Sequence, residues 1–339
     1  MSRMENILVT GGAGFIGLHL VKKLLSSYKR GYKVVVIDDM SSSKEKSISS
    51  SKHKINSTQN RCYTFYKRDI RKRKTVSEII SKERIDTCFH LAARVNVPYS
   101  LENRDEIIDV NVKGTLEILE ACARGGVDNL IFASSAAVYG DPARLPLTED
   151  HPLQPLSTYG ASKVAGEALV SSYRHTKRIR NATSLRIFNV YGPGQNQAYA
   201  GVITNFAKRI KRNYAPVVYG DGMQTRDFIH VDDVVECFIL AAQNLENRKI
   251  PEKNIPLSSS YFLPSGVFNV GTGIPTNIST LAKKMTTIFG SKMEPLYDGR
   301  RNQKEIRYSY ADTTKSRYFL KFRAHEKLDS GLREILKRV

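Results

Sequence analysis

The stretch that decides the fold is Asn6-Ile7-Leu8-Val9-Thr10-Gly11-Gly12-Ala13-Gly14-Phe15-Ile16-Gly17, a short apolar strand that runs directly into a glycine-rich turn. A helical pattern follows, because apolar residues recur on one side of a helix at Leu18, Leu20, Val21, Leu24 and Leu25. At a strand-to-helix turn, glycine lets the backbone approach a pyrophosphate, and the helix N-terminus directs its N–H groups at it. The spacing is GxxGxxG rather than the usual GxGxxG, and a purely structural turn is the alternative. We expect a dinucleotide-binding loop.

The next apolar strand, residues 33–37, ends in Asp38. An acidic residue about 20 positions beyond the glycines is placed to accept hydrogen bonds from an adenosine ribose. A carboxylate would repel a 2′-phosphate, which favours NAD over NADP. Two alternatives stay open: Asp38 as a plain turn residue, and Lys44 with Lys46 as ligands of a 2′-phosphate.

Tyr159 and Lys163 lie about one helical turn apart in Thr-Tyr-Gly-Ala-Ser-Lys, downstream of the pair Ser134-Ser135. An ammonium beside a phenol favours the phenolate, so we expect a lowered pKa for Tyr159 and a usable base near neutral pH. Alone, the pair is more typical of a half-exposed amphipathic helix than of an active site.

Strand-like runs at residues 6–10, 33–38, 62–68, 86–92, 129–134 and 182–188 alternate with helical patterns. This alternation indicates an α/β fold with a Rossmann-type, doubly wound parallel sheet. The Ser- and Lys-rich residues 41–60 predict a surface loop after Asp38. With 41% hydrophobic residues in 339, the chain has ample material for a large core.

The net charge of +20 raises the question of nucleic acid, but the basic residues are spread throughout. The densest run, residues 68–74, predicts the start of a solvated helix rather than a nucleic-acid surface. No apolar run reaches membrane-spanning length and no leader is evident, so we expect a cytoplasmic protein. The scattered cysteines, which are Cys62, Cys88, Cys122 and Cys237, predict reduced thiols. The histidines show no paired metal spacing, so no metal site is expected.

Together these motifs resemble the extended short-chain dehydrogenase/reductase family. The resemblance rests on the glycine loop, Asp38, Asp69-Ile70, Leu91-Ala92-Ala93, Asn111, residues 135–140 and the Tyr159/Lys163 pair. Residues 185–193, 220–233, 268–271 and 311–312 look like the nucleotide-sugar epimerase branch of that family. The resemblance extends from Ile7 to about Phe322.

The resemblance implies an acid/base role for Tyr159, with Lys163 as its pKa partner and a ligand of the nicotinamide ribose. Ser135 would supply a second hydrogen bond to the reacting oxygen, and Ser134 is its alternative. Contacts to NAD are implied for the loop, the strand ends and the catalytic helix: Gly11, Gly14, Phe15, Ile16, Gly17, Asp38, Asp69, Ile70, Leu91, Ala92, Ala93, Asn111, Tyr159 and Lys163.

Substrate contacts are implied for Ser135, Tyr159, Asn189, Val202, Arg226, Arg301 and Ser309. Asn302 occupies the place of the family's usual diphosphate arginine, which leaves the assignment of Arg301 in doubt. Ser309 aligns with a position that bounds the pocket around the sugar C2 substituent. A small residue there resembles the enzymes that also admit an N-acetyl group.

The resemblance implies an NAD-binding domain of residues 1–189, to which residues 231–270 return. It leaves 190–230 and 271–339 as a smaller C-terminal lobe that binds the nucleotide sugar. It also implies a homodimer formed through the helices of residues 111–123 and 159–173.

The expected activity is NAD-dependent C4 epimerisation of a UDP-hexose, such as the UDP-glucose and UDP-galactose of galactose metabolism, with the N-acetyl sugars also possible substrates. A nucleotide-sugar 4,6-dehydratase is the nearest rival, yet Ala136-Ala137 stand where dehydratases carry an Asp-Glu pair. A uronate 4-epimerase on the same scaffold is another. A non-catalytic NAD- or nucleic-acid-binding protein is the rival of a different class.

Overall fold

Seven parallel strands form the central sheet of the computed structural model, in the order β10-β6-β5-β4-β1-β2-β3. The structure describes residues 4–27, 33–42, 62–195, 201–244, 266–299 and 306–338. The strands of this sheet are β1 (Asn6–Thr10), β2 (Lys33–Asp38), β3 (Cys62–Lys67), β4 (Thr87–His90), β5 (Asn129–Ser135), β6 (Asn181–Ile187) and β10 (Val267–Val270). The predicted α/β Rossmann-type fold is confirmed.

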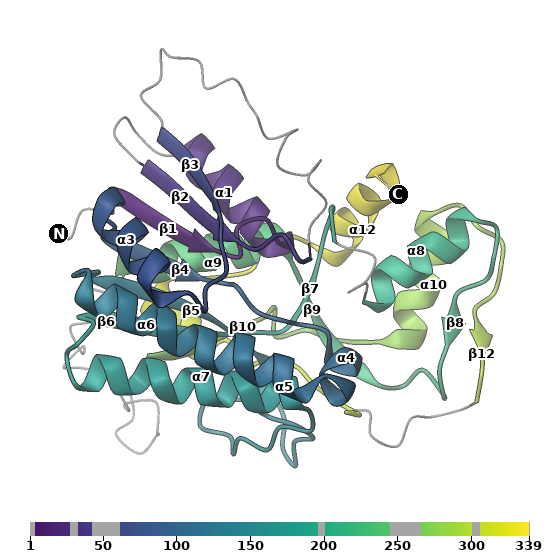
Figure 1. Ribbon diagram of the computed structural model, residues 1–339. Helices are drawn as coiled ribbons and strands as arrows, with labels where there is room; N and C mark the ends of the chain where they lie inside the picture. The colour runs from purple at the N-terminus through teal and green to yellow at the C-terminus, as the bar shows by residue number, and fades with distance from the viewer. Residues whose placement is uncertain are drawn as a thin grey trace.

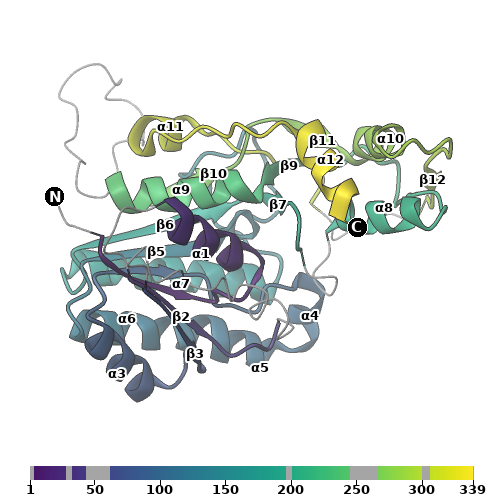
Figure 2. The ribbon, with the colours of Figure 1, turned by 90° about the horizontal axis from the view of Figure 1, so that it is seen from above.

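Helices cover both faces of the sheet (Figure 2). On one face lie α1 (Phe15–Ser27) and α9 (Val231–Asn244), and on the other α3 (Arg73–Glu83), α6 (Gly114–Arg124) and α7 (Thr158–His175). Successive strand residues point to opposite faces. Val9 and Val36 therefore pack in the core beneath α1 and α9, whereas Leu8 and Val35 pack beneath α3 and α6.

The strand order changes direction at β1, which pairs with β2 on one side and β4 on the other. In such sheets, ligands bind in the crevice beyond the carboxyl ends of the strands at this switch point. Gly11, Asp38, Leu91 and Ser135 stand at or just after the ends of β1, β2, β4 and β5. The topology therefore brings them to one edge.

The smaller lobe lies beside the sheet, at the right of Figure 1. Its strands are β7 (Asn189–Tyr191), β9 (Thr225–His230) and β11 (Pro275–Asn277) in one sheet, and β8 (Val217–Val218) and β12 (Leu296–Tyr297) in another. Helices α8 (Val202–Lys211), α10 (Ile278–Ile288) and α12 (Leu328–Arg338) complete the lobe. Its buried core includes Ile203, Phe206, Leu281, Met285 and Leu332.

Helix α11 (Thr314–Leu320) departs from the expected division of the chain. It packs against α9 and β10, and Leu320 and Phe322 are buried in the core of the large sheet. These apolar side chains complete the α9 face, so this part of residues 271–339 lies with the dinucleotide domain.

The helix expected over residues 111–123 begins with a π-helical turn and continues as an α-helix. After α4 (Val97–Glu102) and α5 (Arg104–Ile107), residues Ile108–Lys113 form a π-helical turn, η2, before α6 begins. Asn111 lies in this turn, where its side chain bonds to the backbone of Arg94. π-turns of this kind occur frequently at functional sites.

The composition raised the matters of membrane-spanning helices, metal-binding groups, cysteines and the basic run at residues 68–74. Across the described ranges, no helix is long and apolar enough to cross a bilayer. The same ranges hold no group of three or more His, Cys, Asp or Glu side chains that could bind a metal ion. Cys88, Cys122 and Cys237 are buried free thiols. In the basic run, Arg71 pairs with Asp69 and Asp109, and α3 begins at Arg73 as expected.

Candidate active site

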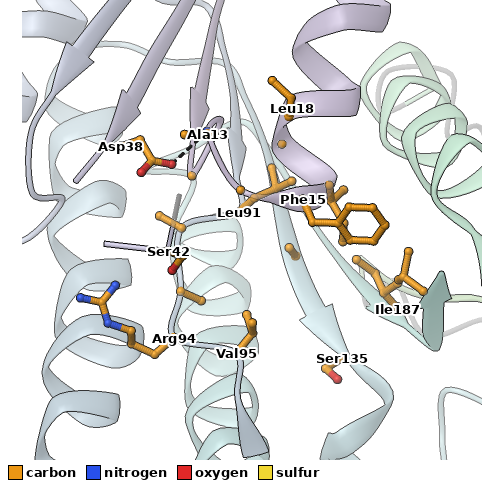
Figure 3. A pocket seen from close by; sticks show the side chains of 18 of the residues that line it. Ala13, Phe15, Leu18, Asp38, Ser42, Leu91, Arg94, Val95, Ser135 and Ile187 are labelled. Atoms are coloured by element: carbon orange, nitrogen blue, oxygen red, sulfur yellow. Dashed lines mark hydrogen bonds between the residues drawn. The ribbon is translucent and has the colours of Figure 1, made fainter. Parts of the chain in front are cut away.

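A cavity of about 850 Å³ opens at the carboxyl edge of the sheet. Figure 3 shows it extending from Asp38 at one end to Ser135 at the other. Most of the residues that the sequence assigns to NAD line it: Gly11, Gly14, Phe15, Ile16, Gly17, Asp38, Asp69, Ile70, Leu91, Ala92, Ala93, Tyr159 and Lys163. The structure thus brings together residues that lie up to about 150 positions apart.

Two of the three spaced glycines are required by packing. Gly11 has φ +70°, and a Cβ there would lie 2.7 Å from the Ala92 nitrogen. A Cβ on Gly17 would lie 2.2 Å from the Gly11 oxygen. Gly14 has no such close neighbour, since its nearest contact would be the Gly11 oxygen at 3.2 Å. Gly14 therefore leaves the cavity side of the loop open, where the unpaired first N–H groups of α1 can bind phosphate oxygens.

Asp38 lines the cavity and is held in place partly by the glycine-rich loop. Its carboxylate accepts hydrogen bonds from the N–H groups of Ala13 at 3.0 Å and Met40 at 2.8 Å. Burial raises the pKa of Asp38, and these two N–H donors and the charge of Arg94 oppose that rise. The position of the carboxylate suits a ribose and disfavours a 2′-phosphate. Lys44 and Lys46 lie outside the described residues.

Asn111 does not line the cavity within the described ranges. It is 2% exposed, and its amide accepts a hydrogen bond from the Arg94 N–H at 2.7 Å and donates one to the Arg94 carbonyl at 3.0 Å. The same amide donates to the Ser162 hydroxyl at 3.0 Å. Asn111 therefore links the segment after β4 to helix α7, which shapes the cavity from behind.

Ser135, which lies at the end of the cavity opposite Asp38 in Figure 3, lines the cavity together with Tyr159 and Lys163. Helix α7 starts at Thr158 because the Ser157 side chain caps it, accepting a hydrogen bond from the Gly160 N–H at 3.1 Å. The Lys163 ammonium lies 5.8 Å from the centre of the Tyr159 ring and donates to the Ala133 carbonyl at 2.8 Å.

The expected lowering of the Tyr159 pKa is wrong for the protein alone. Burial raises the pKa of Tyr159, and the hydrogen bond with Ser135 opposes that rise. Burial also lowers the pKa of Lys163 to about 7, against the charge of Glu167. Both groups are buried, and the loss of solvation is the largest cause of both pKa shifts.

The two candidate serines, Ser134 and Ser135, have different hydrogen-bond partners. Ser134 donates a 2.5 Å hydrogen bond to the buried carboxylate of Glu167, which also binds Arg186 at 2.8 Å. Ser135 has an extended backbone, and its hydroxyl accepts a hydrogen bond from the Ala137 N–H. Ser135 also lines the cavity together with Tyr159. The geometry supports Ser135 in the role shared with Tyr159.

The residues expected to contact substrate are less completely gathered. Of Asn189, Val202, Arg226 and Ser309, only Asn189 lines the cavity as described. Arg226 lies on β9 and donates to the Thr225 carbonyl at 2.8 Å. Ser309 is 8% exposed, and its N–H donates to the same carbonyl at 3.2 Å. Arg301 lies outside the described residues.

The cavity wall also contains residues that the sequence analysis assigned to neither cofactor nor substrate: Asp39, Ser41, Ser42, Arg68, Arg94, Val95, Val110, Phe188, Val190, Gly194 and Gln195. Arg94 directly follows the predicted strand end Leu91-Ala92-Ala93, and that adjacency was the available signal. The partners of Arg94 come from distant segments and had no local pattern.

The fold and the site define a class: a dinucleotide-binding oxidoreductase-type enzyme with a serine, a tyrosine and a lysine at the inner end of its cavity. A model of the NAD dependent epimerase/dehydratase family matches residues 7–256. The chain therefore belongs to the NAD-dependent epimerase/dehydratase family, and its cofactor is NAD.

Known proteins resemble the chain over nearly its full length. A putative UDP-glucose 4-epimerase of Methanocaldococcus jannaschii is 36% identical over 312 residues, covering 91% of this chain and 90% of that protein. The UDP-N-acetylglucosamine 4-epimerase of Methanobrevibacter ruminantium M1, solved with UDP-N-acetylmuramic acid, has a TM-score of 0.82 at 31% identity and covers 99% and 98% of the two chains. The UDP-glucose 4-epimerase of Thermotoga maritima, solved with UDP-glucose, has a TM-score of 0.82 at 32% identity, with 98% of each chain covered.

Proposed function

We propose that the protein interconverts the C4 epimers of a UDP-hexose, with UDP-glucose and UDP-galactose as substrates, through a 4-keto intermediate. The observation that carries the proposal is that Ser135, Tyr159 and Lys163 line one cavity, with the Lys163 ammonium 5.8 Å from the centre of the Tyr159 ring. It places a phenol and a second hydroxyl where one sugar oxygen can bind to both. The similarity to two UDP-sugar 4-epimerases of known structure supports the choice of substrate class.

NAD supplies the hydride acceptor when bound, and because the same hydride returns to the opposite face of C4, no net redox follows. Tyr159 takes the proton of the C4 hydroxyl as the ketone forms and gives it back in the return step. Ser135 donates a second hydrogen bond to that oxygen. Protonated Lys163 favours the phenolate form of Tyr159.

The dehydratase alternative lacks its acid and base. Elimination of water needs a proton donor and acceptor beside the sugar. Ala136 and Ala137, in the short helix after Ser135, present methyl groups at these places. The structure therefore supports epimerisation over dehydration on the same scaffold.

For the breadth of the reaction, we propose activity on both UDP-glucose and UDP-N-acetylglucosamine. The family resemblance implies that a small residue at position 309 admits the acetamido group, and Ser309 is small. Relatives of both kinds support this choice. Asn189, at the mouth of the cavity, and Arg226 are the described residues proposed to hold the nucleotide end, with Arg226 suited to a diphosphate.

The test is to incubate the purified protein with UDP-glucose, UDP-N-acetylglucosamine and UDP-glucuronate in separate reactions and to resolve the C4 epimers. We expect UDP-galactose and UDP-N-acetylgalactosamine from the first two. Conversion of UDP-glucuronate alone would replace the proposal with a uronate 4-epimerase. A 4-keto-6-deoxy product would establish the dehydratase.

A further inference from the structure

Arg94 is a charged residue inside the cavity wall with no role in the chemistry above. Its side chain is 16% exposed and follows the strand-end residues that line the cavity. Figure 3 shows it on the side of the cavity that carries Asp38 and Ser42, away from Ser135. A buried guanidinium must be paired to be tolerated, so its partners show what it does.

The guanidinium joins two separate parts of the chain. On one side, its Nε donates to Glu106 of α5 at 2.8 Å, and the other oxygen of Glu106 accepts a hydrogen bond from Tyr99 of α4. On the other side, it donates to the Ser41 hydroxyl and lies 3.4 Å from the Asp39 carboxylate. Asp39 and Ser41 belong to the loop that follows Asp38 at the end of β2.

The loop side of this bridge is itself ordered. Asp39 accepts hydrogen bonds from the Ser41 hydroxyl at 2.5 Å and the Ser41 N–H at 2.9 Å. Both residues line the cavity. Arg94 therefore binds a preformed turn in the cavity wall and fixes its distance from α5.

The main chain of Arg94 is also held in place by hydrogen bonds. Asn111 bonds to both its N–H and its carbonyl, and Asn111 is in turn bonded to Ser162 on the catalytic helix. With the backbone clamped, opening of the bridge requires the guanidinium to release its partners. A lysine could not replace this arrangement, because one ammonium lacks the planar fork that reaches carboxylates on two sides.

We propose that the Arg94 bridge to Asp39, Ser41 and Glu106 is a retention device that sets how slowly the cofactor leaves the cavity. The inference rests on the proposed function, in which hydride returned to the same sugar requires NAD to stay bound through the cycle. Arg94 acts as a positioning residue: it holds the turn next to Asp38 against the space that the adenosine half of the cofactor would fill.

The test measures release of reduced cofactor in the absence of any sugar. Protein loaded with NADH is mixed with a large excess of NAD, and the decay of bound NADH fluorescence gives the release rate. Arg94→Met keeps the apolar stem and removes the fork, and we expect release at least tenfold faster than in the unmodified protein. Arg178→Met is the matched control, because Arg178 pairs with Glu120 on the surface beyond the far end of α7 and should leave release unchanged.

Further variants distinguish a bridge from a simple charge. Arg94→Lys should release NADH nearly as fast as Arg94→Met. Asp39→Asn should also speed release, and the double variant with Arg94→Met should be no faster than Arg94→Met alone, because both changes break one linkage. Asp39→Asn also serves if Arg94→Met does not fold.

An unchanged release rate in folded Arg94→Met, full retention in Arg94→Lys, or additive effects in the double variant would each overturn the proposal. The assay contains no sugar, so its result is independent of the epimerase assignment. If the protein converts no UDP-sugar but the release rates are as expected, the proposed function is contradicted. The proposed role of the Arg94 bridge in cofactor release is then still supported.

Discussion

The Ser134 hydroxyl donates a 2.5 Å hydrogen bond to the carboxylate of Glu167. Glu167 and its ion-pair partner Arg186 are both buried, at 6% and 5% side-chain exposure. This contact ties the end of β5 to helix α7. The hydroxyl of Ser134 is thereby engaged away from the reaction, whereas the Ser135 hydroxyl accepts a hydrogen bond from the Ala137 N–H at 3.2 Å and lines the cavity with Tyr159.

Replacement of Ser135 should therefore lower activity, whereas replacement of Ser134 should lower stability. Ser135→Ala should lower kcat by about 10²-fold, because a hydrogen bond to the reacting oxygen is lost. Ser134→Ala should leave kcat within a few-fold and lower the free energy of unfolding by about 1–3 kcal/mol, because a buried carboxylate loses a donor. Steady-state kinetics and urea unfolding of both variants check this, and the reverse pattern would assign the catalytic role to Ser134.

Tyr159→Phe should abolish epimerisation and leave NAD bound, because only the proton-transfer group is removed. Turnover is followed by resolving the UDP-sugar epimers, and bound NAD by the absorbance of the denatured supernatant. Full turnover in this variant would contradict the acid/base role of Tyr159.

Lys163 should make the stability of the cofactor-free protein depend on pH. Burial lowers the pKa of Lys163 from 10.5 to about 7, so between these values the unfolded chain binds a proton that the folded protein does not. The free energy of unfolding should therefore rise with pH across this window. Lys163→Met should flatten the rise by an amount on the order of 2 kcal/mol between about pH 7.5 and 9.5.

His90 and Tyr159, two neighbours of Lys163, do not titrate in that interval. Burial, with the Lys163 charge, lowers the pKa of His90 to about 3, and burial raises that of Tyr159 above its ordinary value of 10. Urea unfolding of protein stripped of NAD measures the difference, and parallel curves for the two proteins would show that Lys163 is charged in the fold.

Asp38→Ala should weaken NAD binding by about 1–3 kcal/mol, the range for a lost hydrogen bond to a charged group. Calorimetric titration of stripped protein with NAD and NADP gives both affinities. Tighter binding of NADP than of NAD by the unmodified protein would contradict the assignment of Asp38 to the ribose.

We also expect a homodimer in which α6 and α7 pack against their counterparts. The exposed side of α7 carries the small residues Ala161, Ala168, Ser171 and Ser172, which permit close helix packing. Leu119, one of the apolar residues on these helices, is fully buried inside the subunit. Sedimentation velocity at micromolar concentration should show a dimer, and Ala168→Arg should shift it to monomer. A monomeric unmodified protein would count against the interface.

The parallel sheet and the cofactor edge were predictable because their signals are local. The glycine turn, the strand ending in Asp38 and the helix with Tyr159 and Lys163 each combine a periodic apolar pattern with residues at fixed offsets. These elements appear within one or two residues of their predicted bounds.

Features that depend on contacts between distant segments were not predictable. The π-turn at residues 108–113 joins α5 to α6 without a gap and leaves no signal in the sequence pattern, and the Arg94 bridge needs Asp39 and Glu106 from other parts of the chain. The direction of the Tyr159 pKa shift was misjudged because helical spacing shows that two groups are close but does not show how deeply both are buried.

The central claim, reversible hydride transfer at C4 within one active site, is tested most directly with UDP-glucose that carries deuterium at C4. The products are examined by proton and deuterium NMR after incubation with the purified protein in ordinary water. We expect UDP-galactose that retains deuterium at C4, because the hydride leaves for NAD and returns to the same carbon. UDP-galactose with hydrogen at C4, or no UDP-galactose at all, would contradict it.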